Sequence, residues 1–243
     1  MSTEVINVYE KEQPILPSLC DYNAELSLTN TAKLFMDLAM YHAEILGIGF
    51  TGFNERGLFW VAVKTKIKVF RKAKMATTVK LATWPEEAGT VRCNRDYEIS
   101  DDEGVLAIGK TEWGIIDSAT HHPKKTKDIY PEELVVIDKR CYPEPFAKLT
   151  GNFEGELLGT YTVRSVDTDY GKHMNNTAYV SAIEGLFDSE ELSKRAFSEL
   201  EIHYKSPCFE GETISFYGVE NEGYLEIKAV NKEDKVIVLA RLK

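Results

Sequence analysis

The chain has 243 residues, of which 43% are hydrophobic and 28% charged, and its formal net charge is −10. This composition indicates a globular protein with room for one large core or two small ones. The acidic balance argues against non-specific nucleic-acid binding, and the short, charge-interrupted apolar stretches argue against a membrane span. The start of the sequence lacks the basic and apolar pattern of a signal peptide, so we expect a cytoplasmic protein. Four widely spaced cysteines without a CxxC pair predict free thiols, with neither disulfides nor a metal site.

The first predicted element is a helix over roughly residues 29–46. One stripe of side chains recurs along it at three- and four-residue spacing: Leu34, Phe35, Leu38, Ala39, His42, Ile45 and Leu46. Four segments with strand-like alternation follow, at residues 58–70, 77–88, 90–100 and 105–117. Turn residues separate the strands at Pro85 to Glu87 and at Asp101 to Gly104. The first half therefore predicts one long helix packed on an antiparallel sheet.

The second half repeats this pattern. Residues 67–81 align without gaps on residues 202–216, an offset of 135 (202 minus 67). Upstream, the Asn-Thr-Ala at residue 30 matches the Asn-Thr-Ala at residue 176, and the hairpin near residue 103 matches the hairpin near residue 234. Three matches in the same order indicate an internal duplication.

We therefore predict an N-terminal repeat over residues 1–130 and a C-terminal repeat over residues 150–243. Residues 131–149 contain three prolines and are predicted to be the linker. A helix wrapped by strands, repeated twice, is an α+β arrangement.

A polar turn that leads into the second helix, predicted over residues 175–187, is the best candidate for a functional site. It contains Asp169, His173, Asn175 and Asn176. The first backbone N–H groups of a helix are unpaired donors with partial positive charge, so they can stabilise the oxyanion that forms during acyl transfer. Asp169 and His173 would add acid and base groups beside it. The alternative is a helix cap with a solvated histidine.

At this point the chain resembles the bacterial acyl-ACP thioesterases of the double-hotdog type, which are related to the plant plastid enzymes. The resemblance rests on an ordered set of motifs over nearly the whole chain: Cys20-Asp21, Phe59-Trp60-Val61, Thr83-Trp84-Pro85, Arg95-Asp96-Tyr97, Trp113 through Asp117, and Asp169 through Asn176. It implies a tandem hotdog fold. It also implies an acyl-chain pocket mainly in the first repeat and catalytic groups in the second.

Two positions depart from the pattern that this resemblance implies. The plant-type motif Asp-x-Asn-x-His has Gly171 in place of its Asn, and the Glu that would activate water is replaced by Pro207. Cys208 is retained. Glu184, eleven residues after His173, is a replacement acid that single-hotdog thioesterases suggest, against the alternative of a solvated helix residue.

The expected mechanism is direct hydrolysis of a thioester without a cofactor or metal. Asp169 or Glu184 would activate water, and His173 would polarise the carbonyl or protonate the leaving thiolate. Cys208 stays open as a nucleophile, against a packing role. The substrate would contact the turn and helix start, and also Trp60 if that side chain lines the acyl pocket instead of filling the core: Gly171, Lys172, Met174, Asn175, Asn176 and Trp60.

The expected activity is release of fatty acid from acyl-ACP, with acyl carrier protein as partner and neither nucleic acid nor membrane involved. An acyl-CoA thioesterase and a non-catalytic acyl-thioester-binding protein are the alternatives. A basic stripe could receive the acidic carrier protein, or could simply be a solvated strand face: Lys64, Lys66, Lys68, Arg71, Lys72 and Lys74. The duplication leaves both a monomer and a homodimer open.

Overall fold

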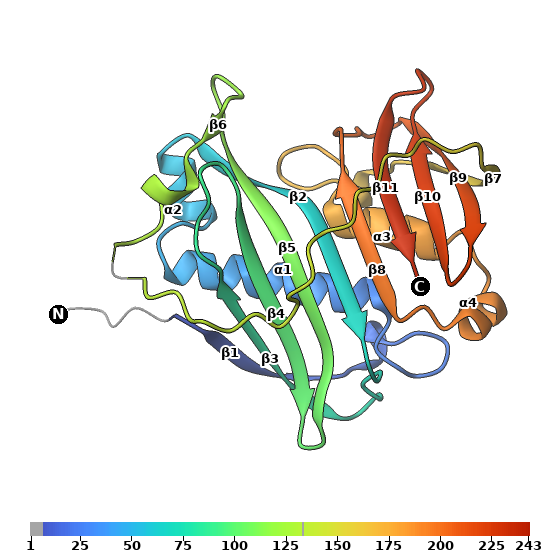
Figure 1. Cartoon of the computed structure of the whole chain (residues 1–243), viewed down its shortest axis with the longest axis horizontal. Helices are drawn as coiled ribbons and strands as arrows, with labels where there is room; N and C mark the ends of the chain where they lie inside the picture. Colours follow the sequence, from blue (N-terminus) through green and yellow to red (C-terminus); the bar gives the residue numbers. More distant parts are fainter. Residues whose placement is uncertain (1–6, 133) are drawn as a thin grey trace. The chain divides into compact units, whose positions relative to one another are not determined.

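The computed structural model of the chain describes residues 7–132 and 134–243. These residues form two units. The first unit holds the chain up to Val63 and Val69–Glu144, and the second holds Lys64–Lys68 and Pro145–Lys243. Each unit contains an antiparallel sheet and helices, which confirms the predicted α+β class (Figure 1).

The first unit is a sheet in the order β1-β3-β4-β5-β2, with the short β6 added to β5. Its strands are β1 (Tyr9–Pro14), β2 (Leu58–Val69), β3 (Thr78–Pro85), β4 (Cys93–Asp101), β5 (Gly104–Asp117) and β6 (Pro123–Lys124). Its helices are α1 (Leu28–Ile45) and α2 (Phe50–Glu55), with 3-10 turns η1 (Pro17–Leu19) and η2 (Thr126–Asp128). All four predicted strands are present, and β1 is an additional edge strand that sequence reasoning missed.

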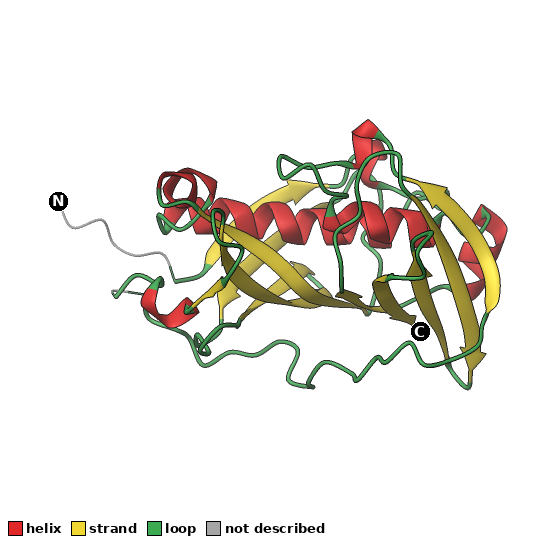
Figure 2. Cartoon of the chain, turned by 90° about the horizontal axis from the view of Figure 1, so that it is seen from above, coloured by secondary structure: helices red, strands yellow, loops and turns green. Residues whose placement is uncertain are grey.

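Helix α1 lies along the sheet of the first unit (Figures 1 and 2). It begins after Ser27, whose hydroxyl accepts a hydrogen bond from the backbone N–H of Asn30. The predicted stripe is buried from Leu34 to His42, whereas Ile45 is 45% exposed and lies outside it. Phe35 stacks on Tyr97 of β4 with 4.8 Å between ring centroids, so apolar contact holds the helix on the sheet.

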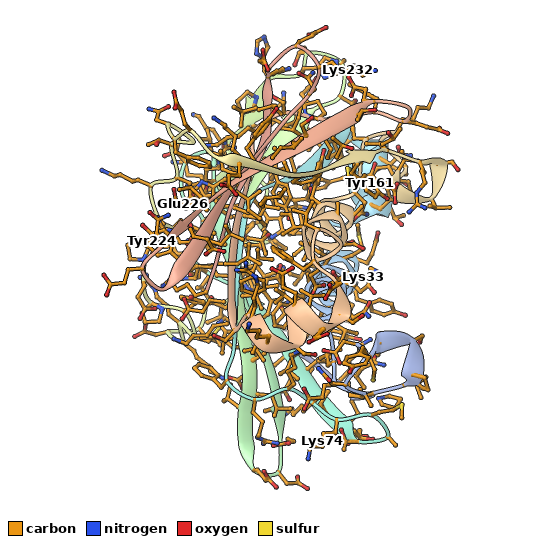
Figure 3. The ribbon with its side chains drawn as sticks, turned by 90° about the vertical axis from the view of Figure 1, so that its right-hand side faces the viewer. Lys33, Lys74, Tyr161, Tyr224, Glu226 and Lys232 are labelled. Carbon is orange, nitrogen blue, oxygen red and sulfur yellow. The ribbon has the colours of Figure 1, made fainter. Side chains whose placement is uncertain are left out.

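The second unit has the sheet order β7-β9-β10-β11-β8, and Lys64–Lys68 of β2 pair with β8. Its strands are β7 (Glu156–Thr162), β8 (Glu199–Tyr204), β9 (Thr213–Asn221), β10 (Tyr224–Val230) and β11 (Val236–Leu242). Its helices are α3 (Asn176–Glu184) and α4 (Ser189–Arg195), with the 3-10 turn η3 (Ser165–Asp167). In Figure 3, Tyr224 and Glu226 mark β10 and Lys232 marks the hairpin that follows it.

The strand order of the second unit reproduces that of the first, element by element, which confirms the predicted duplication. The helices differ. Helix α3 has 9 residues and α1 has 18, so the predicted extension of the second helix to Phe187 is wrong. Gly185 occupies the C-cap of α3, and glycine has low helix propensity, which accounts for the early end.

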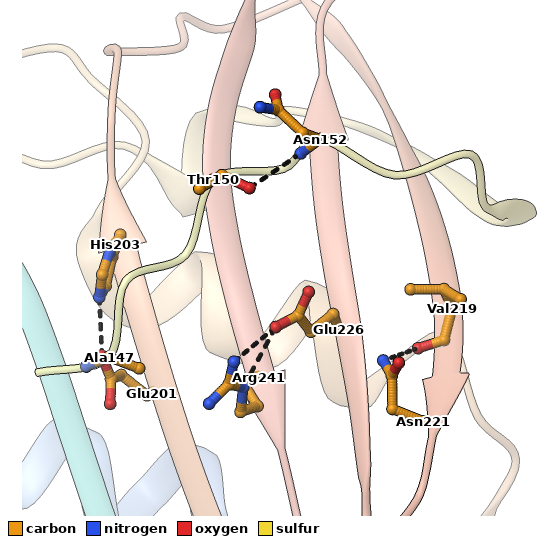
Figure 4. Close-up of polar contacts among 9 residues, drawn as sticks. All are labelled: Ala147, Thr150, Asn152, Glu201, His203, Val219, Asn221, Glu226 and Arg241. Atoms are coloured by element: carbon orange, nitrogen blue, oxygen red, sulfur yellow. Dashed lines mark hydrogen bonds and ion pairs between the residues drawn. The ribbon is translucent and has the colours of Figure 1, made fainter.

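The predicted linker, residues 131–149, makes hydrogen bonds to both sheets. In the first unit the indole N–H of Trp84 donates to the backbone carbonyl of Lys139 at 2.7 Å. In the second unit the backbone N–H of Ala147 donates to Glu201 at 2.7 Å (Figure 4). Within the described part of the chain, no helix has the length and hydropathy needed to cross a membrane.

Candidate active site

The turn from Asp167 to Asn175 is closed by its own backbone. The N–H of Asp169 donates to the carbonyl of His173 at 3.0 Å, and the N–H of Lys172 donates to the carbonyl of Asp169 at 3.0 Å. Lys172 has a φ of 62°, the left-handed conformation that so tight a turn requires. Asn175 then caps α3, because its side-chain oxygen accepts the N–H of Thr177 at 2.9 Å. The predicted helix cap is therefore present, and the acid and the histidine flank the turn that precedes it.

The buried Asp167 holds the start of this turn through hydrogen bonds to its carboxylate. Its carboxylate accepts hydrogen bonds from the Tyr161 hydroxyl and from the backbone N–H of Arg164, both at 2.8 Å. Tyr161 lies on β7 and is labelled in Figure 3. Asp167 is thus a structural acid, and Asp169 is the more accessible of the two.

Backbone donors in the turn are mostly engaged within the protein. The N–H of Gly171 donates to the Asp169 carboxylate at 2.8 Å, and the N–H of Met174 donates to the carbonyl of Cys208 at 2.8 Å. With Lys172 also engaged, His173 is left as the donor between residues 171 and 174 without a partner in the described chain. The first helical residue, Asn176, has a second such N–H. Of the backbone N–H groups expected to contact the oxyanion, those of His173 and Asn176 are therefore the candidates.

The His173 side chain lies against the loop that follows β8. His173 and Phe209 form an isolated antiparallel bridge, and their ring centroids are 5.1 Å apart. The Met174 to Cys208 hydrogen bond belongs to the same pairing. Cys208, one of the predicted site residues, is thus brought to the turn.

Cys208 is fully buried, and burial raises the pKa of its thiol to about 12, with the neighbouring Glu212 adding to the effect. A thiol with so high a pKa supplies almost no thiolate at neutral pH, and thiolate is the nucleophilic form. This favours the packing interpretation of Cys208 over the nucleophile.

Glu212 is a carboxylate at this site that sequence reasoning missed. It accepts the backbone N–H of Phe209 at 2.6 Å, so it sits beside both Cys208 and the residue paired with His173. Gly211, with a φ of 83°, makes the turn that folds Glu212 back. The sequence did offer a signal for Glu212: an acid directly after Gly211, five residues beyond Pro207, the position where the resemblance implies a Glu.

Glu184 is not brought to the turn. It is the last residue of α3, eight residues after Asn176, which corresponds to about 12 Å along the helix axis. The side chain of Met174 is buried in the core, so a substrate contact through that side chain would require movement of the core.

Trp60, the expected acyl-pocket residue, belongs to an aromatic cluster of the first unit. Its indole N–H donates to the Ile48 carbonyl at 2.7 Å, and its ring stacks on Phe53 and meets Trp113 edge-on. It also packs against the core around Ala43 and Ile115. These contacts suit the core role that the sequence left open.

The basic stripe is largely consumed by contacts inside the protein. Lys66 is 2% exposed and lies over the Phe146 ring, and Lys68 pairs with Glu199 at 2.9 Å. Arg71 pairs with Asp101 at 2.8 Å. Of these residues Lys66 is buried, whereas Lys68 and Arg71 stay partly exposed in their ion pairs, so docking of an acidic carrier on this stripe stays a prediction.

Two family models match consecutive parts of the chain. The acyl-ACP thioesterase N-terminal domain matches residues 6–134, and the acyl-ACP thioesterase C-terminal domain matches residues 153–241. The chain belongs to the acyl-ACP thioesterase family. In this family description, the turn with Asp169 and His173 lies in the C-terminal domain.

Curated relatives of the thioesterase family agree with this assignment. The chloroplastic acyl-[acyl-carrier-protein] hydrolase FATB3 of Cuphea viscosissima is 26% identical over 198 residues, which are 75% of this chain and 47% of that protein. The chloroplastic oleoyl-acyl carrier protein thioesterase of Coriandrum sativum is 22% identical over 211 residues, 79% of this chain and 57% of that protein. The chain thus spans about half the length of these relatives.

Solved structures show the same fold. An acyl-ACP thioesterase from Bacteroides thetaiotaomicron superimposes with a TM-score of 0.87 at 20% identity and covers 97% of each chain. The 12:0-ACP thioesterase from Umbellularia californica gives a TM-score of 0.77 at 18% identity and covers 97% of this chain and 96% of the other. The predicted tandem hotdog fold is confirmed.

Proposed function

We propose that this protein hydrolyses the thioester of fatty acyl-ACP, which yields a free fatty acid and the thiol form of acyl carrier protein. The observation that carries the proposal is the turn that holds Asp169 and His173 at the start of α3, in the repeat matched by the C-terminal thioesterase model. The curated relatives are named as hydrolases or thioesterases of acyl carrier protein substrates, which supports the carrier as partner.

We place the substrate carbonyl oxygen at the N–H groups of His173 and Asn176, the two backbone donors around the helix start that have no partner among the described residues. Negative charge develops on this oxygen when water attacks, and preorganised donors stabilise it. The sulfur takes a proton from the His173 imidazolium as the carbon–sulfur bond breaks. The proton that the carboxylate removed from water then returns to His173, since an imidazole can both donate and accept a proton.

Water activation falls to a carboxylate. Asp169 directs one oxygen to the N–H of Gly171, which fixes its orientation and leaves its other oxygen to accept a proton from water. Glu212 is the second carboxylate near His173, and we propose it as the alternative base, since Pro207 has no acidic group.

The proposal is tested by assaying the purified protein with acyl-ACP and with acyl-CoA of matched chain length. We expect a higher kcat/KM for acyl-ACP. Hydrolysis of acyl-CoA alone would contradict the carrier assignment. Tight binding of acyl-ACP without turnover, at enzyme concentrations that allow one turnover to be seen, would contradict hydrolysis.

A further inference from the structure

Three polar residues of the second unit join β7 to the turn that precedes α3. One oxygen of the Asp167 carboxylate accepts hydrogen bonds from the Tyr161 hydroxyl and from the backbone N–H of Arg164, both at 2.8 Å. The Arg164 guanidinium donates to the Tyr161 hydroxyl at 2.9 Å and contacts the carboxylate at 3.5 Å. Asp167 is 9% exposed. A buried acid thus ties β7 to the 3-10 turn η3.

The backbone of Asp167 begins a short ladder that ends at the candidate catalytic groups. Its carbonyl accepts the N–H of Asn175 at 2.8 Å. Two residues further on, the N–H of Asp169 donates to the carbonyl of His173 at 3.0 Å. The residue after Asn175 is Asn176, whose N–H is one of the two candidate oxyanion contacts. A displacement of Asp167 would therefore move both the histidine and the start of the helix.

The first unit builds the same turn without a buried acid. The turn before α1 aligns with the turn before α3 at an offset of 148 (169 minus 21), which matches the 3-10 turns η1 and η3 residue by residue. Leu19 stands at the position of Asp167, and its carbonyl accepts the N–H of the helix cap Ser27 at 3.2 Å. The backbone ladder therefore forms with an apolar side chain at this position.

The two partners of the acid are also replaced in the first unit. Leu16 stands at the position of Arg164, and Gln13 at the position of Tyr161. The Gln13 side-chain amide donates to the carbonyl of its neighbour Pro14 at 3.0 Å. Leucine has no polar side-chain atom, so the hydrogen-bonded network of side chains is a feature of the second repeat.

The network is costly, and the turn does not require it. Burial of the Asp167 carboxylate costs the free energy of its lost hydration, and hydrogen bonds offset this cost only in part. The duplicated turn adopts the same backbone with leucine. Departures from the simplest stable choice occur mainly at functional sites, and a satisfied polar network fixes the groups that it joins. The network therefore indicates a demand for precise geometry in the repeat that carries His173.

We propose that Asp167 is a positioning residue for thioester hydrolysis. Its hydrogen bonds to β7 and to the residue before η3 hold His173 and the start of α3 in the geometry that the reaction needs. The inference rests on the proposed function. Asp167 does not touch the substrate, and its effect reaches the reacting atoms through the turn. Its loss should lower kcat more than it raises KM, because rate depends steeply on the placement of the reacting groups.

Steady-state assays with acyl-ACP test the two hydrogen bonds of the carboxylate. Asp167→Leu, which introduces the residue of the first repeat, should lower kcat by at least about ten-fold with little change in KM. Asp167→Asn should keep most of the activity, because both hydrogen bonds go to one oxygen and an amide oxygen can also accept two. Wild-type kcat in Asp167→Leu, or an equal loss in Asp167→Asn, would overturn the proposal.

A double-mutant cycle tests whether Tyr161 acts through the acid. Tyr161→Phe should lower kcat less than Asp167→Leu does, and adding it to Asp167→Leu should lower kcat no further. Gln13→Leu, the equivalent change in the first unit, should leave kcat unchanged. Additive losses in the double variant would contradict the network.

Nuclear magnetic resonance separates this inference from the proposed function, because it needs no turnover. The His173 ring signals and the hydrogen exchange of the Asn175 amide are compared in wild type, Asp167→Leu and Asp167→Asn, together with melting temperatures. We expect faster exchange and shifted ring signals in Asp167→Leu alone, in a protein that stays folded. If Asp167→Leu does not fold, Tyr161→Phe takes its place in both measurements.

The two failures then differ. Unchanged His173 signals and unchanged Asn175 exchange in a folded variant would overturn the positioning role, even if wild type hydrolyses acyl-ACP. Wild type that is inactive on every thioester, with the expected changes in the variant, would contradict hydrolysis and support the positioning of the turn.

Discussion

The turn before α1 and the turn before α3 share their backbone conformation and hydrogen bonds but carry different side chains. In the first, the N–H of Asp21 donates to the carbonyl of Glu25 at 2.7 Å, where Asp169 donates to His173 at 3.0 Å in the second. Ala24 and Lys172 share a left-handed φ, of 59° and 62°. Two residues further on, the N–H of Leu26 donates to the loop after β2 and the N–H of Met174 donates to the loop after β8, both at 2.8 Å. The duplication preserved the geometry in detail.

The side chains differ at each reactive position. The first turn has Glu25 where the second has His173, and Ala73 accepts the hydrogen bond that Cys208 accepts in the second. Asp21 is neutralised by the Lys72 ammonium at 2.7 Å, whereas Asp169 has no ion pair among the described residues. If only the second turn is catalytic, as we propose, a helix start and an Asp turn are not sufficient for a site. Function is decided by the side chains placed on a shared frame.

The largest expected effect is at the histidine position. His173→Ala should lower kcat/KM for acyl-ACP by two or more orders of magnitude, because a positioned acid or base commonly contributes that much. The matched change in the other turn, Glu25→Ala, should leave hydrolysis near wild type. Steady-state kinetics and melting temperatures check both variants. Near-full activity of His173→Ala would remove this residue from the mechanism.

The aspartates give the next comparison. Asp169→Asn should also lower hydrolysis by two orders of magnitude or more, with little change in melting temperature, because the amide oxygen can still accept the N–H of Gly171. Asp21→Asn should instead leave activity intact and weaken the fold by less than about 1 kcal/mol, as expected for the loss of a partly exposed ion pair. Urea unfolding and kinetics separate the two results, and the reverse pattern would mean that the turns have exchanged roles.

A smaller effect is expected at Glu212. Glu212→Gln keeps an acceptor for the Phe209 N–H but loses the base, so kcat should fall about ten-fold or more. Glu184→Gln and Cys208→Ser should each have a weaker effect in single-turnover hydrolysis, because Glu184 ends α3 and Cys208 is a protonated thiol. An acyl-enzyme trapped on Cys208 would reverse this order.

The last comparison concerns stability instead of hydrolysis, and it involves an acid of the first unit. Burial raises the pKa of Asp96 to about 7, the Glu86 carboxylate adds to this, and the Lys110 ammonium opposes it. Two residues of the proline-containing segment interact with these acids: Arg140 acts on Glu86, and Cys141 lies beside Asp96. Because the folded-state pKa lies above the unfolded value, the fold loses stability as pH rises from about 4 to about 7.

Asp96→Asn should remove this pH dependence. Between about pH 5 and about pH 8 we expect wild type to lose on the order of 2 kcal/mol that the variant keeps. Urea unfolding at several pH values checks the slope, and Asp167→Asn serves as a comparison in the second unit. Parallel pH profiles of wild type and Asp96→Asn would show that Asp96 is ionised throughout.

The sequence pattern alone was enough to predict the duplication, the four strands of the first sheet and the turn with Asp169 and His173. Helix and strand periodicity and capping residues act over a few residues, so a single sequence displays them. The same locality explains the errors. The charged alternation of β1 hid an edge strand, and the helix pattern continued beyond Gly185, where the helix ends.

Tertiary structure decided the chemistry around the turn. Glu212 reaches the site because the loop after β8 pairs with His173. In β2, Lys66 lies over the Phe146 ring and Lys68 pairs with Glu199. Hydrogen bonds and ion pairs join residues that are distant along the chain, and their effect depends on burial, so no local spacing reports them.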